Sequence, residues 1–183
     1  MFLAVPALVL GALAGRIFGG RVRNLATVRL HAVPLLIAGA VAQALGQAIL
    51  NNYLLVLTSF VLMLAFTLAN ARTVGFAIAA LGVACNLVVV SVNDGMPVRR
   101  STMHYLGVTD KQIDNYNFAA KRHIERPDDH VTFLGDVIAV PRVGGAVSVG
   151  DTLLVLGVSV AIAELMRKKT AARSGHYRWS RQN

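Results

Sequence analysis

Apolar and polar residues alternate along the chain in long blocks. Five blocks consist almost wholly of apolar residues, and they cover residues 2–18, 30–50, 53–69, 74–92 and 152–166. A helix needs about 20 mostly apolar residues to cross the hydrocarbon core of a bilayer. The pattern therefore predicts an all-α membrane protein with five transmembrane helices. Four of these helices fall in residues 1–92 and the fifth in residues 152–169.

A long polar segment, residues 93–151, separates the fourth and fifth apolar blocks, and we call it the cap. Residues 110–122 are polar with interspersed apolar side chains, which predicts a short surface helix. Residues 131–141 (VTFLGDVIAVP) and 146–151 (AVSVGD) are rich in β-branched residues and flank a Gly-Gly turn, a pattern typical of short strands. The cap is therefore expected to be small and to contain short β-rich pieces.

The overall composition agrees with a membrane location. Of the 183 residues, 55% are hydrophobic and 15% are charged, and the mean hydropathy is +0.58. Such a chain is too apolar for an ordinary soluble domain. The lone cysteine, Cys85, lies inside an apolar block, so it is interpreted as a core residue that forms no disulfide within the chain and no cysteine-based metal site.

The net charge of +9 has an uneven distribution that predicts a topology. Eleven of the eighteen basic residues fall near the end of the first apolar block or after the first, third and fifth blocks, that is, at alternate turns. Basic residues concentrate on the cytoplasmic side of membrane proteins. We therefore expect a bacterial cytoplasmic (inner) membrane protein with its N-terminus and extracytoplasmic cap outside and residues 170–183 as a basic cytoplasmic tail. The basic residues then face anionic membrane lipids, and nucleic acid is not expected as a partner.

Amide side chains interrupt two of the apolar blocks. In the second block and directly after it they recur every four residues and share one helical face, and a further asparagine lies in the fourth block. The residues are Gln43, Gln47, Asn51 and Asn86. They are interpreted either as hydrogen-bonding contacts between helices or as the polar lining of a path. In the first block, Gly11, Gly15 and Gly19 predict a face for close helix packing.

Motifs for nucleophilic catalysis and phosphate binding are missing, because the sequence contains no GxGxxG, Walker A, GxSxG or HExxH pattern. A divalent metal site would have to be built from cap histidines and aspartates without diagnostic spacing. These are His104, His123, His130, Asp94, Asp128, Asp129, Asp136 and Asp151. No catalytic residue, metal or cofactor is assigned on this basis.

A more regular feature of the cap is the repeated pairing of glycine with aspartate. Gly135-Asp136 and Gly150-Asp151 bracket the β-rich part, and Asp94-Gly95 follows the fourth block. The three carboxylates either meet at one rim, or each builds its own turn or cap. Asp151 precedes the expected fifth helix and would cap it, while Glu164 is expected to form a local ion pair with Arg167. The candidate cap motif consists of Asp94, Met96, Pro97, His130, Asp136 and Asp151.

The motifs Asn93 to Val98, Phe133 to Pro141 and Ser148 to Asp151 also carry a resemblance. In this order they resemble Gly-x-Met-Pro-Val, Phe-Leu-Gly-Asp-Ile-Ile-x-x-Pro and Ser-x-Gly-Asp of a family of uncharacterised bacterial multi-span membrane proteins. The likeness extends over essentially the whole chain, including Arg23-Asn24-Leu25 after the first block. It implies a bacterial cytoplasmic-membrane protein, and it assigns no reaction and no catalytic residue.

Three classes of function remain open from the sequence. The leading hypothesis is a non-enzymatic accessory or assembly component whose cap contacts a protein partner, a second copy of the chain or a ligand. The first alternative is a small transporter or channel lined by Gln43, Gln47, Asn51 and Asn86. The second is an outward-facing membrane enzyme that uses aspartates and histidines of the cap.

Overall fold

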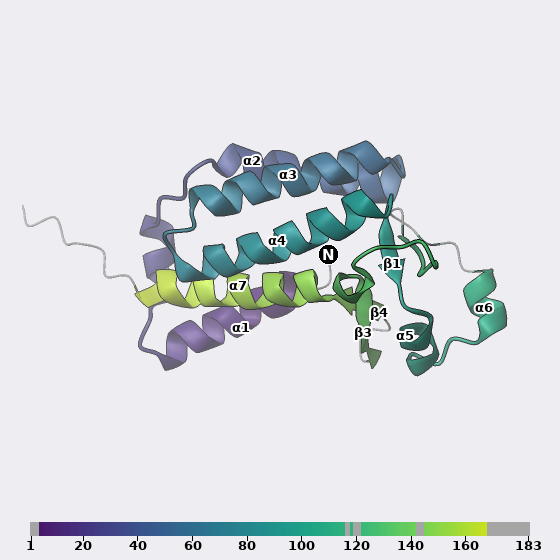
Figure 1. The fold of residues 1–183 in the computed structure, drawn as a ribbon. Coiled ribbons are helices and arrows are strands. Elements are labelled where there is room, and N and C mark those ends of the chain that lie inside the picture. Colours follow the sequence, from purple (N-terminus) through teal and green to yellow (C-terminus); the bar gives the residue numbers. More distant parts are fainter. Residues whose placement is uncertain (1–3, 116–117, 119–121, 142–144, 168–183) are drawn as a thin grey trace, which may run out of the picture.

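The computed structural model describes residues 4–115, 118, 122–141 and 145–167. Long helices lie side by side, and the cap extends from one end of them (Figure 1). The predicted cytoplasmic tail, residues 170–183, lies outside the described residues. The helical part consists of α1 (Ala4–Ile17), η1 (Val22–Thr27), α2 (Val33–Ala44), the π-helical turn η2 (Leu45–Ile49), α3 (Tyr53–Ala69), α4 (Val74–Val92) and α7 (Val149–Arg167). The cap contributes β1 (Met96–Val98), α5 (Arg100–Tyr105), α6 (Asp110–Asp114), β2 (Arg122–Ile124), η3 (Thr132–Leu134), β3 (Asp136–Val140) and β4 (Gly145–Ser148).

The prediction of five transmembrane helices is wrong. Within the described residues, only α4 and α7, each of 19 residues, are long and apolar enough to cross a membrane. The helices α1 and α3 contain 14 and 17 residues, and the 12 residues of α2 continue directly into the 5 residues of η2. At a rise of 1.5 Å per residue none of these exceeds about 26 Å, which is less than the hydrocarbon core of about 30 Å.

In the first two apolar blocks, backbone features interrupt the helices, whereas α3 and α4 span the predicted blocks 53–69 and 74–92. Gly19 adopts a left-handed φ of 78° just after α1. Ala32 has a φ of 55°, and Pro34 lies in the first turn of α2, so this helix begins only at Val33. Before α3, the Asn52 side chain accepts a hydrogen bond from the Leu55 amide at 3.1 Å and caps the helix. Hydropathy gave the start of α3 correctly but does not detect the left-handed residues Gly19 and Ala32.

The all-α fold class is also wrong, because the cap contains a four-stranded mixed sheet in the order β2-β1-β3-β4. Strand β1 pairs in parallel with β2 and β3, and β3 pairs antiparallel with β4. Strands β3 and β4 lie in the two segments for which β-rich pieces were expected. Of the helix expected over residues 110–122, the described residues contain α6, and Arg122 belongs to β2. Three-residue strands such as β1 and β2 are too short to show an alternating pattern.

Close contact between α4 and α7 forms the centre of the helical part. Small residues line this interface, and we call them the small-residue seam: Gly75, Ala79 and Gly82 of α4 with Gly150, Gly157 and Ala161 of α7. A Cβ atom added at Gly75 would overlap the Ala161 backbone nitrogen, and one at Gly82 would lie 2.6 Å from the Gly150 carbonyl oxygen. The two backbones therefore touch directly, as they do at small-residue interfaces between membrane helices.

The first helix packs on the other side of α7 through glycines. A Cβ atom at Gly11 would lie 2.8 Å from the Ser159 carbonyl oxygen, and one at Gly15 would lie 2.6 Å from Met166 Sδ. Gly19, the third residue of the predicted glycine face, would meet nothing within 4 Å. Two of the three glycines therefore make the close helix contact, and Gly19 instead supplies the turn after α1.

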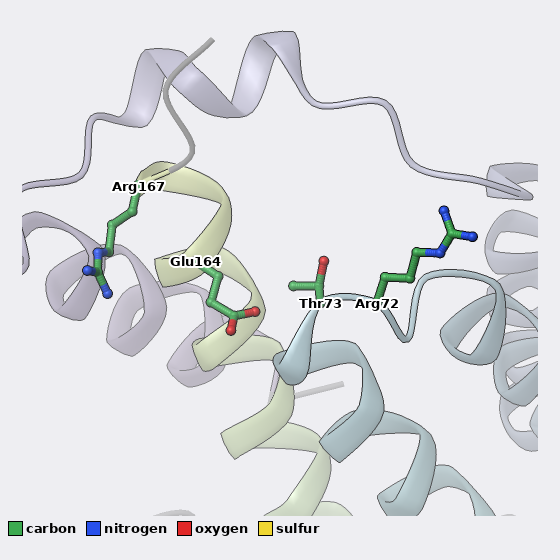
Figure 2. Close-up of a pocket in the computed structure, with 4 residues that line it drawn as sticks. All are labelled: Arg72, Thr73, Glu164 and Arg167. Atoms are coloured by element: carbon green, nitrogen blue, oxygen red, sulfur yellow. The ribbon is translucent and has the colours of Figure 1, made fainter. Parts of the chain in front are cut away.

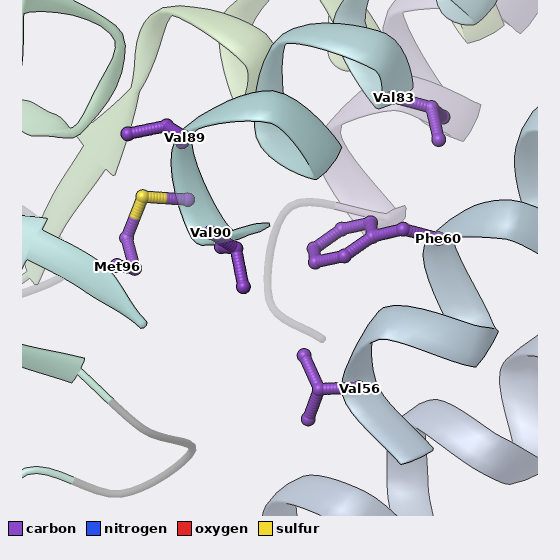
Figure 3. Packing of buried hydrophobic residues seen from close by; sticks show 6 residues of the cluster. All are labelled: Val56, Phe60, Val83, Val89, Val90 and Met96. Carbon is purple, nitrogen blue, oxygen red and sulfur yellow. The ribbon is translucent and has the colours of Figure 1, made fainter. Parts of the chain in front are cut away.

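Larger apolar side chains fill the spaces on either side of the seam. One cluster joins α3, α4 and the start of β1, and Figure 3 shows it as Val56, Phe60, Val83, Val89, Val90 and Met96. At the opposite end of the same helices, the rings of Phe66 and Phe76 meet edge to face, with centroids 5.6 Å apart. In the cap, Val98, Met103 and Ile113 bury α5 and α6 against the sheet. Met96 therefore connects the sheet to the helices.

The seam gives a direct mutational prediction. Gly75→Ala should lower the free energy of unfolding of the full chain by about 1–3 kcal/mol, because the added methyl group meets rigid backbone. Gly39→Ala on α2 is the matched control, since its methyl group would first meet the flexible Met63 side chain, with Cγ at 3.1 Å. Denaturant unfolding in mixed micelles measures both variants. Equal stability of the two would contradict the backbone contact.

Candidate functional site

A buried polar cluster lies where the sheet meets α4 and α7. Asn86 of α4 is 2% exposed and uses both ends of its amide. Its Nδ2 donates to Asp151 Oδ1 at 2.8 Å, and its Oδ1 accepts from Ser148 Oγ at 2.9 Å. A buried amide in an apolar helix is costly unless it is hydrogen-bonded. Asn86 therefore ties α4 to the junction of β4 and α7.

Ser148 and Asp151 also bond to each other and define the start of α7. The Asp151 amide donates to Ser148 Oγ at 2.9 Å, and the Ser148 amide lies 3.4 Å from Asp151 Oδ2. This reciprocal arrangement is a capping box. Asp151 was expected to precede the helix, but α7 begins at Val149, so Ser148 is the cap and Asp151 lies in the first turn. The Ser-x-x-Asp spacing was the available sequence signal for Ser148.

Asp136 of β3 is the second acidic residue of the cluster and faces Ser148 across the β3–β4 ladder. It is 1% exposed, and its Oδ2 lies 3.0 Å from Arg122 Nε. Its Oδ1 is the buried side-chain polar atom that has no hydrogen-bond partner in the described part of the chain. Unsatisfied buried polar atoms are rare in folded proteins. Asp136 therefore stands out in the cap as a buried carboxylate with one unsatisfied oxygen.

The surroundings of Asp136 change its acidity. Removal from water raises the pKa of Asp136 to about 7, against the lowering effect of the Arg122 guanidinium, and the Asp151 carboxylate adds to the rise. Arg122 compensates only in part because its side chain is 41% exposed and remains hydrated. A buried acid with a pKa near neutrality changes its charge within the ordinary pH range.

The residues of the candidate cap motif do not all lie together in the structure. Asp136 and Asp151 belong to the buried cluster. Met96 and Pro97 are buried in β1, where a Cβ atom at Gly135 would lie 2.5 Å from the Pro97 carbonyl oxygen. Asp94 is exposed in a left-handed turn with a φ of 51°. The three carboxylates thus do not form one rim, because only two of the Gly-Asp pairs contribute to the cluster.

His130, the remaining member of the motif, is exposed and is held through its backbone. Its amide donates to Asn93 Oδ1 at 2.6 Å, and its carbonyl oxygen accepts from Asn93 Nδ2 at 2.9 Å. The next residue, Val131, has a φ of 46°, which is strained for a β-branched side chain. The turn leaves Phe133 61% exposed. Sequence reasoning treated Asn93 only as the end of a helix and missed this clamp.

The amides of the predicted intramembrane polar face also lie apart. Gln43 Oε1 accepts a hydrogen bond from Ser59 Oγ between α2 and α3, whereas Asn86 lies between α4 and α7. Gln47 is half-buried in η2, and Asn51 is exposed in a turn with a φ of 43°. This arrangement favours the interpretation as contacts between helices over a continuous lining.

The histidines and aspartates of the metal hypothesis form pairs. His104 Nε2 lies 2.9 Å from Asp110 Oδ1, and His123 Nε2 lies 3.0 Å from Asp129 Oδ2. Hydrogen bonds from Arg100 and then His104 lower the pKa of the Asp110 carboxyl. Among residues 4–115, 118, 122–141 and 145–167, no three His, Cys, Asp or Glu side chains meet as a metal site requires. The geometry therefore gives the metal hypothesis no support.

A cavity of about 330 Å³ lies at the other end of α4 and α7 and is lined by Arg72, Thr73, Glu164 and Arg167 (Figure 2). Glu164 Oε2 accepts a hydrogen bond from the Gly75 amide at 3.3 Å, at the start of α4. Arg167 points away from Glu164 in Figure 2, and its guanidinium lies 5.9 Å from the centroid of the Phe18 ring. Glu164 therefore joins α7 to α4 instead of forming the expected pair with Arg167.

Of the three comparisons with known proteins, one gives a family assignment. A family model described as a family of unknown function, DUF5317, matches residues 22–163. No curated protein matches the chain, and no solved structure matches it. The matched region includes α4, the whole cap with its buried cluster, and most of α7. The chain therefore belongs to DUF5317, a family of unknown function.

Proposed function

We propose that this chain is an integral protein of the bacterial cytoplasmic membrane that holds a small folded cap on the outer side. In this proposal the cap is the working part, and it contacts a protein partner as an accessory or assembly component. The helices α4 and α7 carry the chain across the bilayer. The observation that carries the proposal is the apolar outer surface of the helical part.

This surface is extensive and covers several helices. On the five α-helices of the helical part, the large apolar side chains that are at least half exposed are Val5, Leu8, Val9, Leu10, Leu13 and Ile17 of α1, Ile37 and Val41 of α2, Leu54, Val61 and Leu68 of α3, Val74, Leu81 and Val92 of α4, and Leu156 of α7. Contiguous apolar surface of this extent is rare on soluble monomers and marks a membrane or protein interface. Lipid around α4 and α7 would cover it, and the shorter helices would share the same apolar layer.

The arrangement of charge supports an orientation. Arg16, Arg72 and Arg167 lie at or next to the ends of α1, α4 and α7 that are remote from the cap. Arg21, Arg23 and Arg29 lie in the connection between α1 and α2. By the positive-inside rule this end faces the cytoplasm, which leaves the cap outside and the C-terminal end of α7 inside. The arginines then meet anionic lipid headgroups.

Contact with a partner is the activity that the cap geometry supports best. Asp136 is too deeply buried to touch a substrate, which weakens the alternative of an outward-facing enzyme. Gln43 and Asn86 are used in contacts between helices, which weakens the transporter alternative. The cap instead presents two aromatic side chains, Tyr105 at 75% and Phe133 at 61% exposure. Exposed aromatic residues are frequent anchors of protein interfaces.

Cysteine labelling tests the membrane orientation. In a Cys85→Ser background, Asp128→Cys places a thiol on the exposed cap, and Arg29→Cys places one at the opposite end. A membrane-impermeant maleimide should label Asp128→Cys in intact bacterial spheroplasts and Arg29→Cys only after lysis. The opposite pattern would overturn the orientation. Recovery of the intact protein in the salt-washed soluble fraction would overturn the membrane location.

Photo-crosslinking tests the contact with a partner. A photoreactive phenylalanine analogue at Phe133 should give a discrete adduct in native membranes after irradiation. The same analogue at Lys111, which is exposed on α6, is the control and should give little adduct. Two differently tagged copies of the chain distinguish a second copy from another protein. The experiment is repeated with the analogue at Tyr105 in place of Phe133. The proposal would be contradicted if both aromatic positions gave no adduct, or no more adduct than Lys111.

A further inference from the structure

We propose that Asp136 is a proton-binding site that controls how firmly the sheet of the cap is held against α4 and α7. The inference depends on the buried cluster and goes beyond the proposed partner contact. It starts from the Oδ1 atom of Asp136, which is enclosed by protein and has no hydrogen-bond partner in the described part of the chain. Its Oδ2 has the single ionic contact with Arg122. One carboxylate oxygen is therefore left without compensation.

The charged groups that surround Asp136 do not balance. Strand β2 contributes Arg122, and α7 contributes the Asp151 carboxylate. Between β1 and α5 lies Arg99, whose amide donates to the Asp136 carbonyl oxygen at 3.2 Å and whose guanidinium lies 3.4 Å from Glu125. From β4 and α4 come Ser148 and Asn86, which are neutral. Asp136 thus faces one unshared cation, Arg122, and one further carboxylate, Asp151, so the cluster carries more negative than positive charge.

The carboxylate that lacks compensation is that of Asp136 and not that of Asp151. Asp151 accepts hydrogen bonds from the Asn86 side chain and the Ser148 amide, and it lies in the first turn of α7, where the helix dipole favours a carboxylate. A metal ion at Asp136 would need further ligands, and the described residues supply no group of three. A proton needs no additional space, and it converts the unpaired oxygen of a buried anion into part of a neutral carboxyl group.

Protonation at this position acts directly on the contact between the cap and the helices. Asp136 faces Ser148 in the β3–β4 ladder, and Ser148 both caps α7 and bonds to Asn86 of α4. Neutral Asp136 does not repel Asp151 and is compatible with burial. Charged Asp136 repels Asp151 and favours water, so β3 is held less firmly. If the cap faces outward, as proposed above, the site responds to the pH outside the cell.

The direction of the pH dependence follows from the raised pKa. Folding raises the pKa of Asp136 from 3.8 to about 7, so the folded state binds the proton more tightly than the unfolded state. The extra stability is complete below the unfolded pKa of 3.8, decreases as pH rises, and is lost above about 7. The cap is therefore expected to be held firmly in mildly acidic medium and more loosely in alkaline medium.

Hydrogen–deuterium exchange of the full chain in lipid nanodiscs tests the proposal. After correction for the intrinsic exchange rate, protection of the β3 amides should fall roughly tenfold or more between pH 5 and pH 8. Asp136→Asn should remove this dependence, while Asp114→Asn on the exposed surface of α6 should retain it. Protection that does not change with pH in the wild type, or the same change in Asp136→Asn, would overturn the proposal.

Arg122→Gln gives an independent test in case Asp136→Asn fails to fold. Arg122 is 41% exposed, so its replacement removes a charge without leaving a cavity in the core. Because Arg122 lowers the pKa of Asp136, this variant should move the midpoint of the β3 transition to higher pH. Infrared difference spectra of the same variants follow the protonated carboxyl band directly. An unchanged midpoint in Arg122→Gln would also overturn the proposal.

Discussion

Direct backbone contact between α4 and α7 is the constraint on which the remaining structure depends. Glycine and alanine in the small-residue seam allow it, and the hydrogen bonds of Asn86 to Ser148 and Asp151 fix its end next to the cap. Ser148 is both the last residue of β4 and the cap of α7, so the same contact positions the sheet. The polar cluster therefore follows from the way in which the two longest apolar helices meet.

The sequence predicted the positions of the long helices better than their lengths. Each apolar block contains one long helix, because continuous hydrophobicity marks buried or lipid-facing segments. The blocks 53–69 and 74–92 agree with α3 and α4, whereas Gly19 and Ala32 end or delay the first two helices inside or beside apolar runs. The sheet was only half predicted. Strands β3 and β4 carry β-branched residues, whereas β1 is buried through Met96, Pro97 and Val98 and depends on pairing with distant segments.

The candidate site shows a similar division. The repeated Gly-Asp pairs drew attention to Asp136 and Asp151, and they do meet in one cluster. Asp94 does not, because its turn leaves it in solvent. Spacing could have indicated Ser148, whose capping box with Asp151 is a local pattern. Arg122 lies 14 residues before Asp136 and reaches it only through the parallel strands, so no local pattern could reveal this ion pair. The resemblance to an uncharacterised family agrees with the family assignment, which likewise names no activity.

The most direct test of this account is the stability of Asn86→Leu in the full chain. Leucine preserves apolar volume but removes both hydrogen bonds, so the free energy of unfolding should fall by about 2–3 kcal/mol. Asn115→Leu, at an exposed amide after α6, should change it by no more than about 0.5 kcal/mol. Exchange protection of β4 should fall together with that of α4 in Asn86→Leu. Unchanged stability of Asn86→Leu, with unchanged protection at the start of α7, would contradict the central role of this contact.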